Sequence, residues 1–224
     1  MNNKIATDSN IFVRVRKLIY DNFKIIISVL VSIFLIFLGY QLYSYYKLSI
    51  IQKNSITYFS GKNLNNDEEY YKLMEKLSDN NDFYSILSKL ELVNLNIKNE
   101  DYKEAFELYI SILRNNKIES VYKSAIATKA VYNFIDIQYK YTSSDFIPNI
   151  KELISFIDGN LTSYEGIKLE LEYLLSITEI DLNNIDYKSS NKILDLHKVI
   201  IESENISSTI KERVNKIHEF QLYN

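Results

Sequence analysis

The residues that could perform chemistry in this sequence are few and scattered. Only two histidines, His197 and His218, occur among 224 residues, and no acidic ligand set accompanies them at the spacing of a metal site. No cysteine occurs, which excludes disulfides, thiolate zinc sites and cysteine nucleophiles. The acidic run DEE at residues 67–69 suits the first turn of a helix, where carboxylates stabilise exposed amides. We therefore expect no metal site, no cofactor and no catalytic site.

Nucleotide and nucleic-acid chemistry has equally little support. The four glycines form no glycine-rich loop for a phosphate, and no serine lies in a G-x-S-x-G setting. Residues 47–224 carry 21 basic and 27 acidic side chains, a net charge of −6, whereas a nucleic-acid surface needs a basic face. We predict a protein that is not an enzyme and that binds neither nucleic acid nor a small-molecule substrate.

The segment that must position the rest of the chain is one long uncharged stretch. Residues 25–46 are 22 consecutive residues without a charge. As a helix they would be about 33 Å long, close to the thickness of a hydrocarbon core, about 30 Å. Three interpretations compete: an uncleaved membrane anchor, a cleaved signal peptide and the core helix of a soluble protein. We favour the anchor, because the run exceeds the apolar core of a signal and lacks a small-residue cleavage site.

The flanks of this stretch predict its orientation. Five basic residues precede it and three follow within a comparable distance, so the positive-inside rule places residues 1–24 in the cytoplasm. Aromatic rings at its far end suit the headgroup level. The predicted membrane-interface residues are Arg14, Arg16, Lys17, Lys24, Tyr43 and Tyr46. We therefore predict a cytoplasmic basic tail at residues 1–24, a transmembrane helix at 25–46 and an exported domain at 47–224.

The sequence of residues 47–224 is typical of helices. Four glycines and one proline in the whole chain argue against sheets and tight hairpins. Apolar residues recur at helical spacing, as in the stripe formed by Ile86, Leu90 and Val93. Between such stripes lie clusters of Asn, Ser, Thr and Asp, whose oxygens can cap a first turn. We expect an all-α fold with about eight helices after the anchor.

A short motif recurs along this part of the chain. NEDYK at residues 99–103 returns as NIDYK at 184–188, and SSDFI at 143–147 repeats its Asp–aromatic step. The aromatic residues Tyr102, Phe146 and Tyr187 are 44 and 41 residues apart, and we expect each to open the second helix of a pair. Helix pairs at this period predict an α-solenoid, because a single pair cannot bury its apolar face alone.

The first copy of the motif resembles a known repeat. NEDYKEAFELYISIL at residues 99–113 is similar to the second helix of a tetratricopeptide repeat. Glu100 departs from that pattern, since the family usually has glycine there. The aromatic, small, aromatic and aliphatic positions are Tyr102, Ala105, Tyr109 and Leu113. Together with Phe146 and Tyr187, these are the predicted repeat-packing residues.

The resemblance also suggests where a partner would bind. In tetratricopeptide arrays the first helix of each pair faces the groove. Three tyrosines on expected first helices are therefore candidate groove residues: Tyr84, Tyr132 and Tyr139. The alternative is that they are core or scattered surface aromatics.

The layout of the whole chain resembles one bacterial family, the single-span, tetratricopeptide-like ancillary subunits of the Sec translocon. Both have a basic tail, one span, a helix that continues past it and degenerate helical repeats. The resemblance implies a single-pass inner-membrane protein with a cytoplasmic N-terminus and a periplasmic domain, in contact with the Sec translocon and periplasmic chaperones. Similar repeats occur in cell-division coordinators, so an envelope scaffold for cell division or cell-wall synthesis is the alternative.

Overall fold

A computed structural model describes residues 3–142, 145–183 and 186–223, and every regular element in these ranges is a helix. The prediction of an all-α fold is therefore confirmed. Ser143 and Ser144 of the SSDFI motif and Asn184 and Ile185 of the NIDYK motif lie outside the described residues. The chain divides into two compact units, residues 1–63 and residues 64–224, and each is described by itself.

The first unit consists of two helices joined at Asn22: α1 (Asn3–Asp21) and α2 (Phe23–Gly61). The most apolar 18-residue window of α2 has a mean hydropathy of 2.5, and none of that window is buried. This helix is long and apolar enough to span a membrane. It continues unbroken past residue 46. The six predicted interface residues are all exposed, three on α1 (Arg14, Arg16 and Lys17) and three on α2 (Lys24, Tyr43 and Tyr46).

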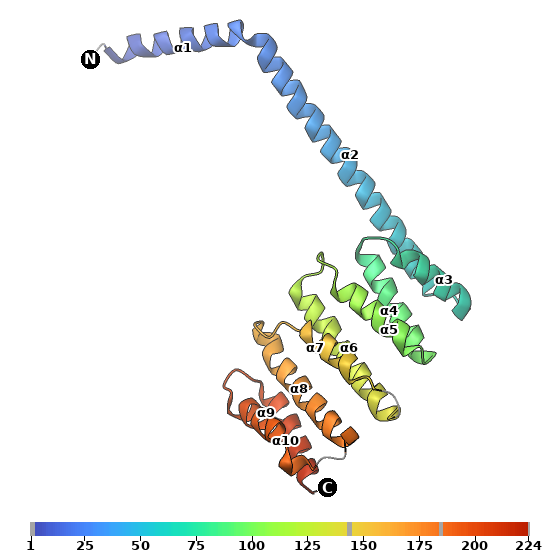
Figure 1. The fold of residues 1–224 in the computed structure, drawn as a ribbon. Coiled ribbons are helices and arrows are strands. Elements are labelled where there is room, and N and C mark those ends of the chain that lie inside the picture. Colours follow the sequence, from blue (N-terminus) through green and yellow to red (C-terminus); the bar gives the residue numbers. More distant parts are fainter. Residues whose placement is uncertain (1–2, 143–144, 184–185, 224) are drawn as a thin grey trace. The chain divides into compact units, whose positions relative to one another are not determined.

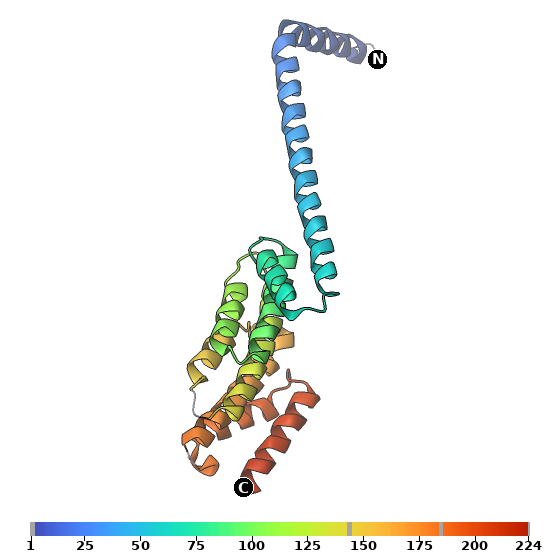
Figure 2. The same cartoon turned by 90° about the vertical axis from the view of Figure 1, so that its right-hand side faces the viewer.

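The second unit contains eight α-helices and one 3-10 turn within the described residues, in agreement with the number expected (Figures 1 and 2). Each α-helix from α3 to α10 packs against the next one along the chain, and α6 also packs against α8. The elements are α3 (Asp67–Ser78), α4 (Phe83–Lys98), α5 (Tyr102–Leu113), α6 (Ser120–Lys140), α7 (Ile147–Ser155), α8 (Thr162–Asn183), η1 (Tyr187–Ser189), α9 (Asn191–Glu202) and α10 (Ser208–Tyr223).

Short polar side chains start several of these helices. The carboxylate of Asp82 accepts a hydrogen bond from the backbone N–H of Ser85 at 3.0 Å, and so begins α4. The side chain of Asn66 caps α3 in the same way, by accepting from the backbone N–H of Glu68 at 2.9 Å. The acidic run at residues 67–69 forms the first turn of α3, as expected. Such caps satisfy first-turn amides that have no partner inside the helix.

The turn between α4 and α5 is closed by backbone hydrogen bonds. The N–H of Asp101 donates to the carbonyl of Asn96 at 2.8 Å, and the N–H of Glu100 donates to that of Ile97 at 3.2 Å. This pair of bonds is a Schellman motif. Its central residue, Glu100, has φ of 63°, in the left-handed region that favours glycine. Glu100, at the position where the tetratricopeptide pattern usually has glycine, thus adopts a backbone conformation that favours glycine.

Two apolar clusters form the core of the second unit. The first is built by α4 to α8, and its fully buried members include Tyr109, Phe134 and Leu171. The second is built by α8, η1, α9 and α10 around Tyr173 and Ile193. The helix α8 contributes to both clusters, so it joins the two halves of the unit.

Two of the recurring aromatic residues differ from expectation. Tyr102 opens α5 as predicted, but Phe146 is the residue before α7, and Tyr187 opens the 3-10 turn η1. The side chain of Asp186 accepts a hydrogen bond from the backbone N–H of Lys188 at 3.1 Å, which holds this short turn. The α-helix α9 begins only after it, at Asn191.

Candidate protein-binding groove

An apolar groove of about 660 Å³ lies between the first part of α4 and the first part of α6. Its floor and walls are aliphatic and aromatic. The apolar lining residues are Phe83, Ile86, Leu87, Leu90, Ile118, Tyr122, Ala125 and Ile126. Phe83 and Tyr122 are each 62% exposed, which is far more than a core aromatic. The groove is therefore an accessible apolar surface and not an internal cavity.

The α4 wall follows from a cap and a helical repeat. Because Asp82 caps the helix, Phe83 occupies its first position. Ile86, Leu87 and Leu90 follow at i+3, i+4 and i+7, so all four side chains lie on one face. The next residue of the predicted stripe, Val93, is fully buried in the core. One continuous apolar stripe thus lines the groove at its start and the core at its end.

The α6 wall is held in place by the loop that precedes α8. The hydroxyl of Ser120 donates a hydrogen bond to the carboxylate of Asp158 at 2.8 Å. The hydroxyl of the buried Ser124 accepts one from the backbone N–H of Asp158 at 3.0 Å. The hydrogen bond from Ser120 lowers the pKa of the Asp158 carboxyl. These contacts fix the first two turns of α6, from which Tyr122 projects.

The rim of the groove is polar and mixed in charge. Asp82 and Glu119 bring negative charge, and Lys117 brings positive charge. The side chain of Asn115 accepts a hydrogen bond from the backbone N–H of Lys117 at 2.9 Å, which shapes the α5–α6 loop. An apolar centre with a polar rim is the usual composition of a protein-binding surface.

The three predicted groove tyrosines do not line this groove. Tyr84 is half-buried on α4, with its ring 5.6 Å from that of Phe83. Tyr139 lies at the other end of α6, where its hydroxyl hydrogen-bonds Asp181 of α8 at 3.2 Å. Tyr132 lies beside Glu170 of α8, and burial together with that charge raises its pKa. Tyr84 thus lies on α4 beside Phe83, whereas Tyr132 and Tyr139 lie on α6 and face α8.

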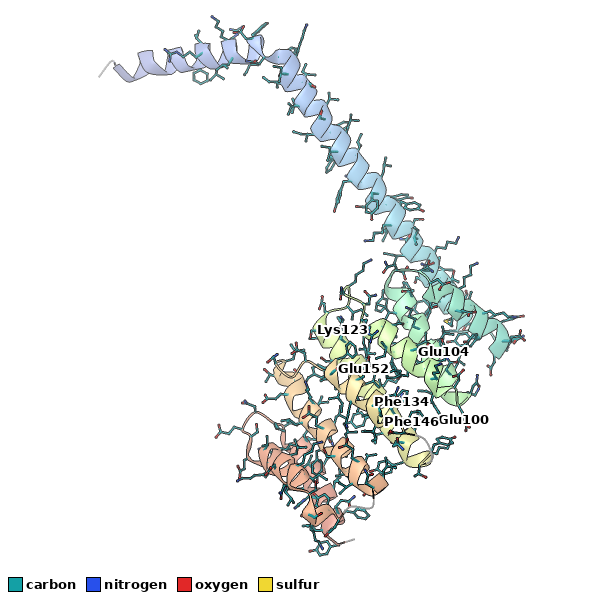
Figure 3. The ribbon with its side chains drawn as sticks, in the orientation of Figure 1. Glu100, Glu104, Lys123, Phe134, Phe146 and Glu152 are labelled. Carbon is teal, nitrogen blue, oxygen red and sulfur yellow. The ribbon has the colours of Figure 1, made fainter. Side chains whose placement is uncertain are left out.

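The predicted repeat-packing residues lie in the two cores. Ala105, Tyr109 and Leu113 are fully buried in the first cluster. Tyr102 and Phe146 pack at its edge with ring centroids 5.7 Å apart, and Phe146 also contacts Phe134 at 5.8 Å (Figure 3). Tyr187 belongs to the second cluster instead.

An ion pair between the buried Glu170 of α8 and the half-exposed Arg213 of α10 joins the two helices. Both carboxylate oxygens of Glu170, which is 2% exposed, accept hydrogen bonds from the guanidinium of Arg213, at 2.7 and 2.5 Å. This bidentate bond raises the pKa of Arg213. A charge buried to this extent needs such a partner, so the pair fixes how α10 sits on α8.

The two histidines, far apart in the sequence, meet in the second cluster. The rings of His197 on α9 and His218 on α10 stack with centroids 3.9 Å apart. Nδ1 of His218 is hydrogen-bonded to the hydroxyl of Tyr187, which in turn is 2.8 Å from the hydroxyl of Tyr173. Burial, and then the neighbouring His197, lower the pKa of His218. The fold therefore favours the neutral form of His218 over the protonated form.

Sequence reasoning missed both the groove and the histidine pair. A sequence pattern could have indicated the groove, because the apolar surface of α4 is wider than a single narrow stripe. The residues that widen it are Phe83, Ile86, Leu87 and Leu90. The stacking of His197 on His218 had none, because it depends on how α9 and α10 pack.

Neither a search for metal-ligand clusters nor comparisons with known proteins add a further site. Within residues 3–142, 145–183 and 186–223, no three His, Cys, Asp or Glu side chains cluster as metal ligands would. Comparisons of the chain with models of known protein families, with curated proteins and with solved structures find no match.

Proposed function

We propose that this chain is a membrane-anchored protein-interaction module that binds segments of partner proteins in the groove between α4 and α6. The observation that carries the proposal is the accessible apolar surface around Phe83 and Tyr122. Water-exposed apolar surface of this extent, rimmed by polar groups, gains free energy when a partner covers it. The module is not an enzyme in this proposal and uses no cofactor.

The long apolar helix supports anchoring in a membrane. Along its apolar stretch, α2 exposes large apolar side chains, which water does not solvate favourably. We propose a single pass, with residues 1–24 in the cytoplasm and the helical domain in the periplasm, at the bacterial inner membrane. The excess of basic residues before the span supports this orientation.

Local features support a tetratricopeptide-like arrangement of the helix pairs. Ala105 is fully buried at the position where the repeat needs a small residue. Glu100 has the left-handed backbone of the family's glycine. We propose that the pairs α4–α5, α6–α7 and α8–α9 are degenerate repeats, whose first helices present the groove.

The identity of the partner rests on the resemblance of the chain layout. We propose the Sec translocon together with periplasmic folding factors, which gives the protein an ancillary role in export. An envelope scaffold for cell division or cell-wall synthesis remains the second candidate. The two differ in the complex that the protein joins.

Site-specific photocrosslinking in native membranes tests this function. A photoreactive amino acid replaces Tyr122 in the groove, and a matched probe replaces Phe220, which is 65% exposed on α10. We expect adducts with export components at position 122 and not at position 220. Adducts with division or cell-wall proteins at 122 would favour the scaffold instead. Identical adduct patterns at the two positions would contradict the groove.

A topology measurement tests the anchor separately. A reporter that is active only after export, fused after Asn224, should be active, and the protein should stay in the membrane fraction. A mature N-terminus that maps near residue 40 would instead identify a cleaved signal peptide.

A further inference from the structure

Exposed apolar side chains extend beyond α2 into α1. Among the side chains that the structure describes on α1, those from residue 12 onward include six large apolar residues that are exposed: Phe12, Val13, Val15, Leu18, Ile19 and Tyr20. A helix in water would gain nothing from displaying them. An apolar environment at this point of the chain would account for their exposure.

Most of the apolar and charged residues in the last three turns of α1 lie on different faces. Phe12, Val15 and Ile19 follow each other at i, i+3 and i+7, on one side of the helix. Arg14, Lys17 and Asp21 have the same spacing, offset by two residues, and so lie on the opposite side. Arg16 lies at the edge of the apolar face, four residues after Phe12, and Leu18 lies on the charged side, four residues after Arg14. The helix is therefore amphipathic over its last three turns, but the two faces are not strictly separated.

A bend separates α1 from the apolar helix that follows. Asn22 has φ of −112° and ψ of 15°, outside the helical region, and its side-chain amide donates to the carbonyl of Leu18 at 3.1 Å. Both views of the ribbon show α1 turning away from the axis of α2 at this residue (Figures 1 and 2). A chain that runs along a membrane surface before it crosses the membrane needs such a bend.

We infer that α1 is an interfacial helix that lies on an anionic lipid surface. Phe12, Val15 and Ile19 insert at the boundary between headgroups and acyl chains, and Arg14 and Lys17 contact lipid phosphates. This inference rests on the proposed anchoring by α2, because only one residue separates the two helices and the span holds α1 at the membrane surface.

Charge selects lipid as the occupant of this face. From residue 12 to residue 24, four basic side chains stand against one acidic side chain, Asp21. Anionic headgroups attract such a cluster, whereas a second copy of α1 would bring like charges together. The proposed topology places α1 at the cytoplasmic leaflet, and the positive-inside rule expects basic residues on that side.

The absence of cysteine makes the inference directly measurable. Single-cysteine variants at positions 12, 15 and 19, and at 14 and 17, can each carry one nitroxide label in the full-length protein. The protein is reconstituted in vesicles of phosphatidylglycerol and phosphatidylethanolamine, or of phosphatidylcholine alone. Accessibility is measured to oxygen, which concentrates in lipid, and to a neutral, water-soluble nickel chelate. A label at Ile33 in α2 and one at Glu212 on α10 serve as lipid and water references.

In anionic vesicles, we expect labels at 12, 15 and 19 to be several-fold more accessible to oxygen than to the chelate. Labels at 14 and 17 should show the reverse. In phosphatidylcholine this contrast should shrink. In anionic vesicles, Arg14→Gln with Lys17→Gln should lower the ratio of oxygen to chelate accessibility for the labels at 12, 15 and 19.

Three results would overturn the inference. If all five labels on α1 match the water reference while position 33 stays in lipid, α1 is not interfacial and the anchor stands. If position 33 is also in water, the proposed anchor itself fails. If protection at 12, 15 and 19 depends on the protein-to-lipid ratio and not on lipid charge, a second copy covers this face.

Discussion

The two ends of α6 have different neighbours. Near its start, Tyr122 and Ile126 line an open apolar groove opposite α4. Near its end, Tyr139 is hydrogen-bonded to Asp181 of α8, and Tyr132 lies against the ion-paired Glu170. The polar hydrogen bonds between the end of α6 and α8 fix how these two helices pack. The apolar surface at the start of α6 stays open, and it gains free energy only when a partner covers it.

The comparison separates the proposed binding region from a region that polar contacts hold closed. The part from α3 to the start of α6 keeps accessible apolar surface, and the part from the end of α6 to α10 uses buried polar contacts to hold its helices together. Changes in the second part should therefore reduce stability, and changes in the groove should reduce partner binding with little loss of stability.

The largest effect should come from removing the cation that pairs with the buried Glu170. Arg213→Met leaves the carboxylate of Glu170, which is 2% exposed, without its cation. Breaking a fully buried pair costs about 3–5 kcal/mol, and because the Arg213 side chain is 49% exposed we expect a smaller loss of about 2 kcal/mol. Urea unfolding of the full chain in mild detergent, followed by circular dichroism, measures the loss. Lys72→Met is the control, because Lys72 pairs with Glu68 on an exposed surface and should change stability by about 0.5 kcal/mol or less. Similar losses of unfolding free energy in the two variants would mean that the contact between Glu170 and Arg213 does not hold α8 and α10 together.

Two alanines distinguish the closed core from the open groove. Ala105 is fully buried, and Ala125 is exposed on the groove wall. Ala105→Phe should overpack the core and cost about 1–3 kcal/mol of unfolding free energy. Ala125→Phe should leave the unfolding free energy nearly unchanged and weaken crosslinking at position 122, since the new ring fills the groove. A loss below about 0.3 kcal/mol for Ala105→Phe would contradict the close packing of α5.

Acidification should loosen the second part of the domain through His218. Its pKa is lowered in the fold, so the unfolded chain binds more protons over the interval below the ordinary value of about 6.5. The stability that neutral His218 contributes is intact above pH about 6.5. It is lost as the pH falls through the lowered pKa of His218 in the folded protein. The groups around the ring are His197 on α9, Tyr187 on η1 and Glu219 on α10.

The control for this pH effect is His218→Gln, which keeps a hydrogen-bonding group but cannot titrate. Urea midpoints at pH 8 and pH 5.5 should differ less in this variant than in the unmodified chain. Equal pH dependence in the two proteins would show that His218 is not the source.

The smallest effect should come from the left-handed residue Glu100. Glu100→Gly and Glu100→Ala both remove the hydrogen bond from Tyr141, but only the alanine has a Cβ at φ of 63°. The glycine variant should therefore be the more stable by about 1 kcal/mol. The same pair of changes at Glu104, within α5, should reverse the order, because glycine weakens a helix. Thermal unfolding ranks the four variants.

The sequence alone determined the class of structure and its main segments. Scarce glycine and proline with apolar residues at helical spacing predicted the all-α fold and about eight helices after the anchor, in residues 47–224. The uncharged stretch predicted one helix long and apolar enough to span a membrane. The motif around Tyr102 predicted the burial of Ala105, Tyr109 and Leu113. These features depend on local periodicity, which a sequence displays directly.

Only the tertiary structure decided which apolar surfaces stay open and which polar groups meet. Tyr122 and Tyr139 lie on the same helix, yet the first lines a groove and the second is bonded to α8. His197 and His218 stack because α9 and α10 pack side by side. Periodicity shows which face of a helix is apolar, but the neighbour that covers it is chosen by packing between residues far apart in the chain.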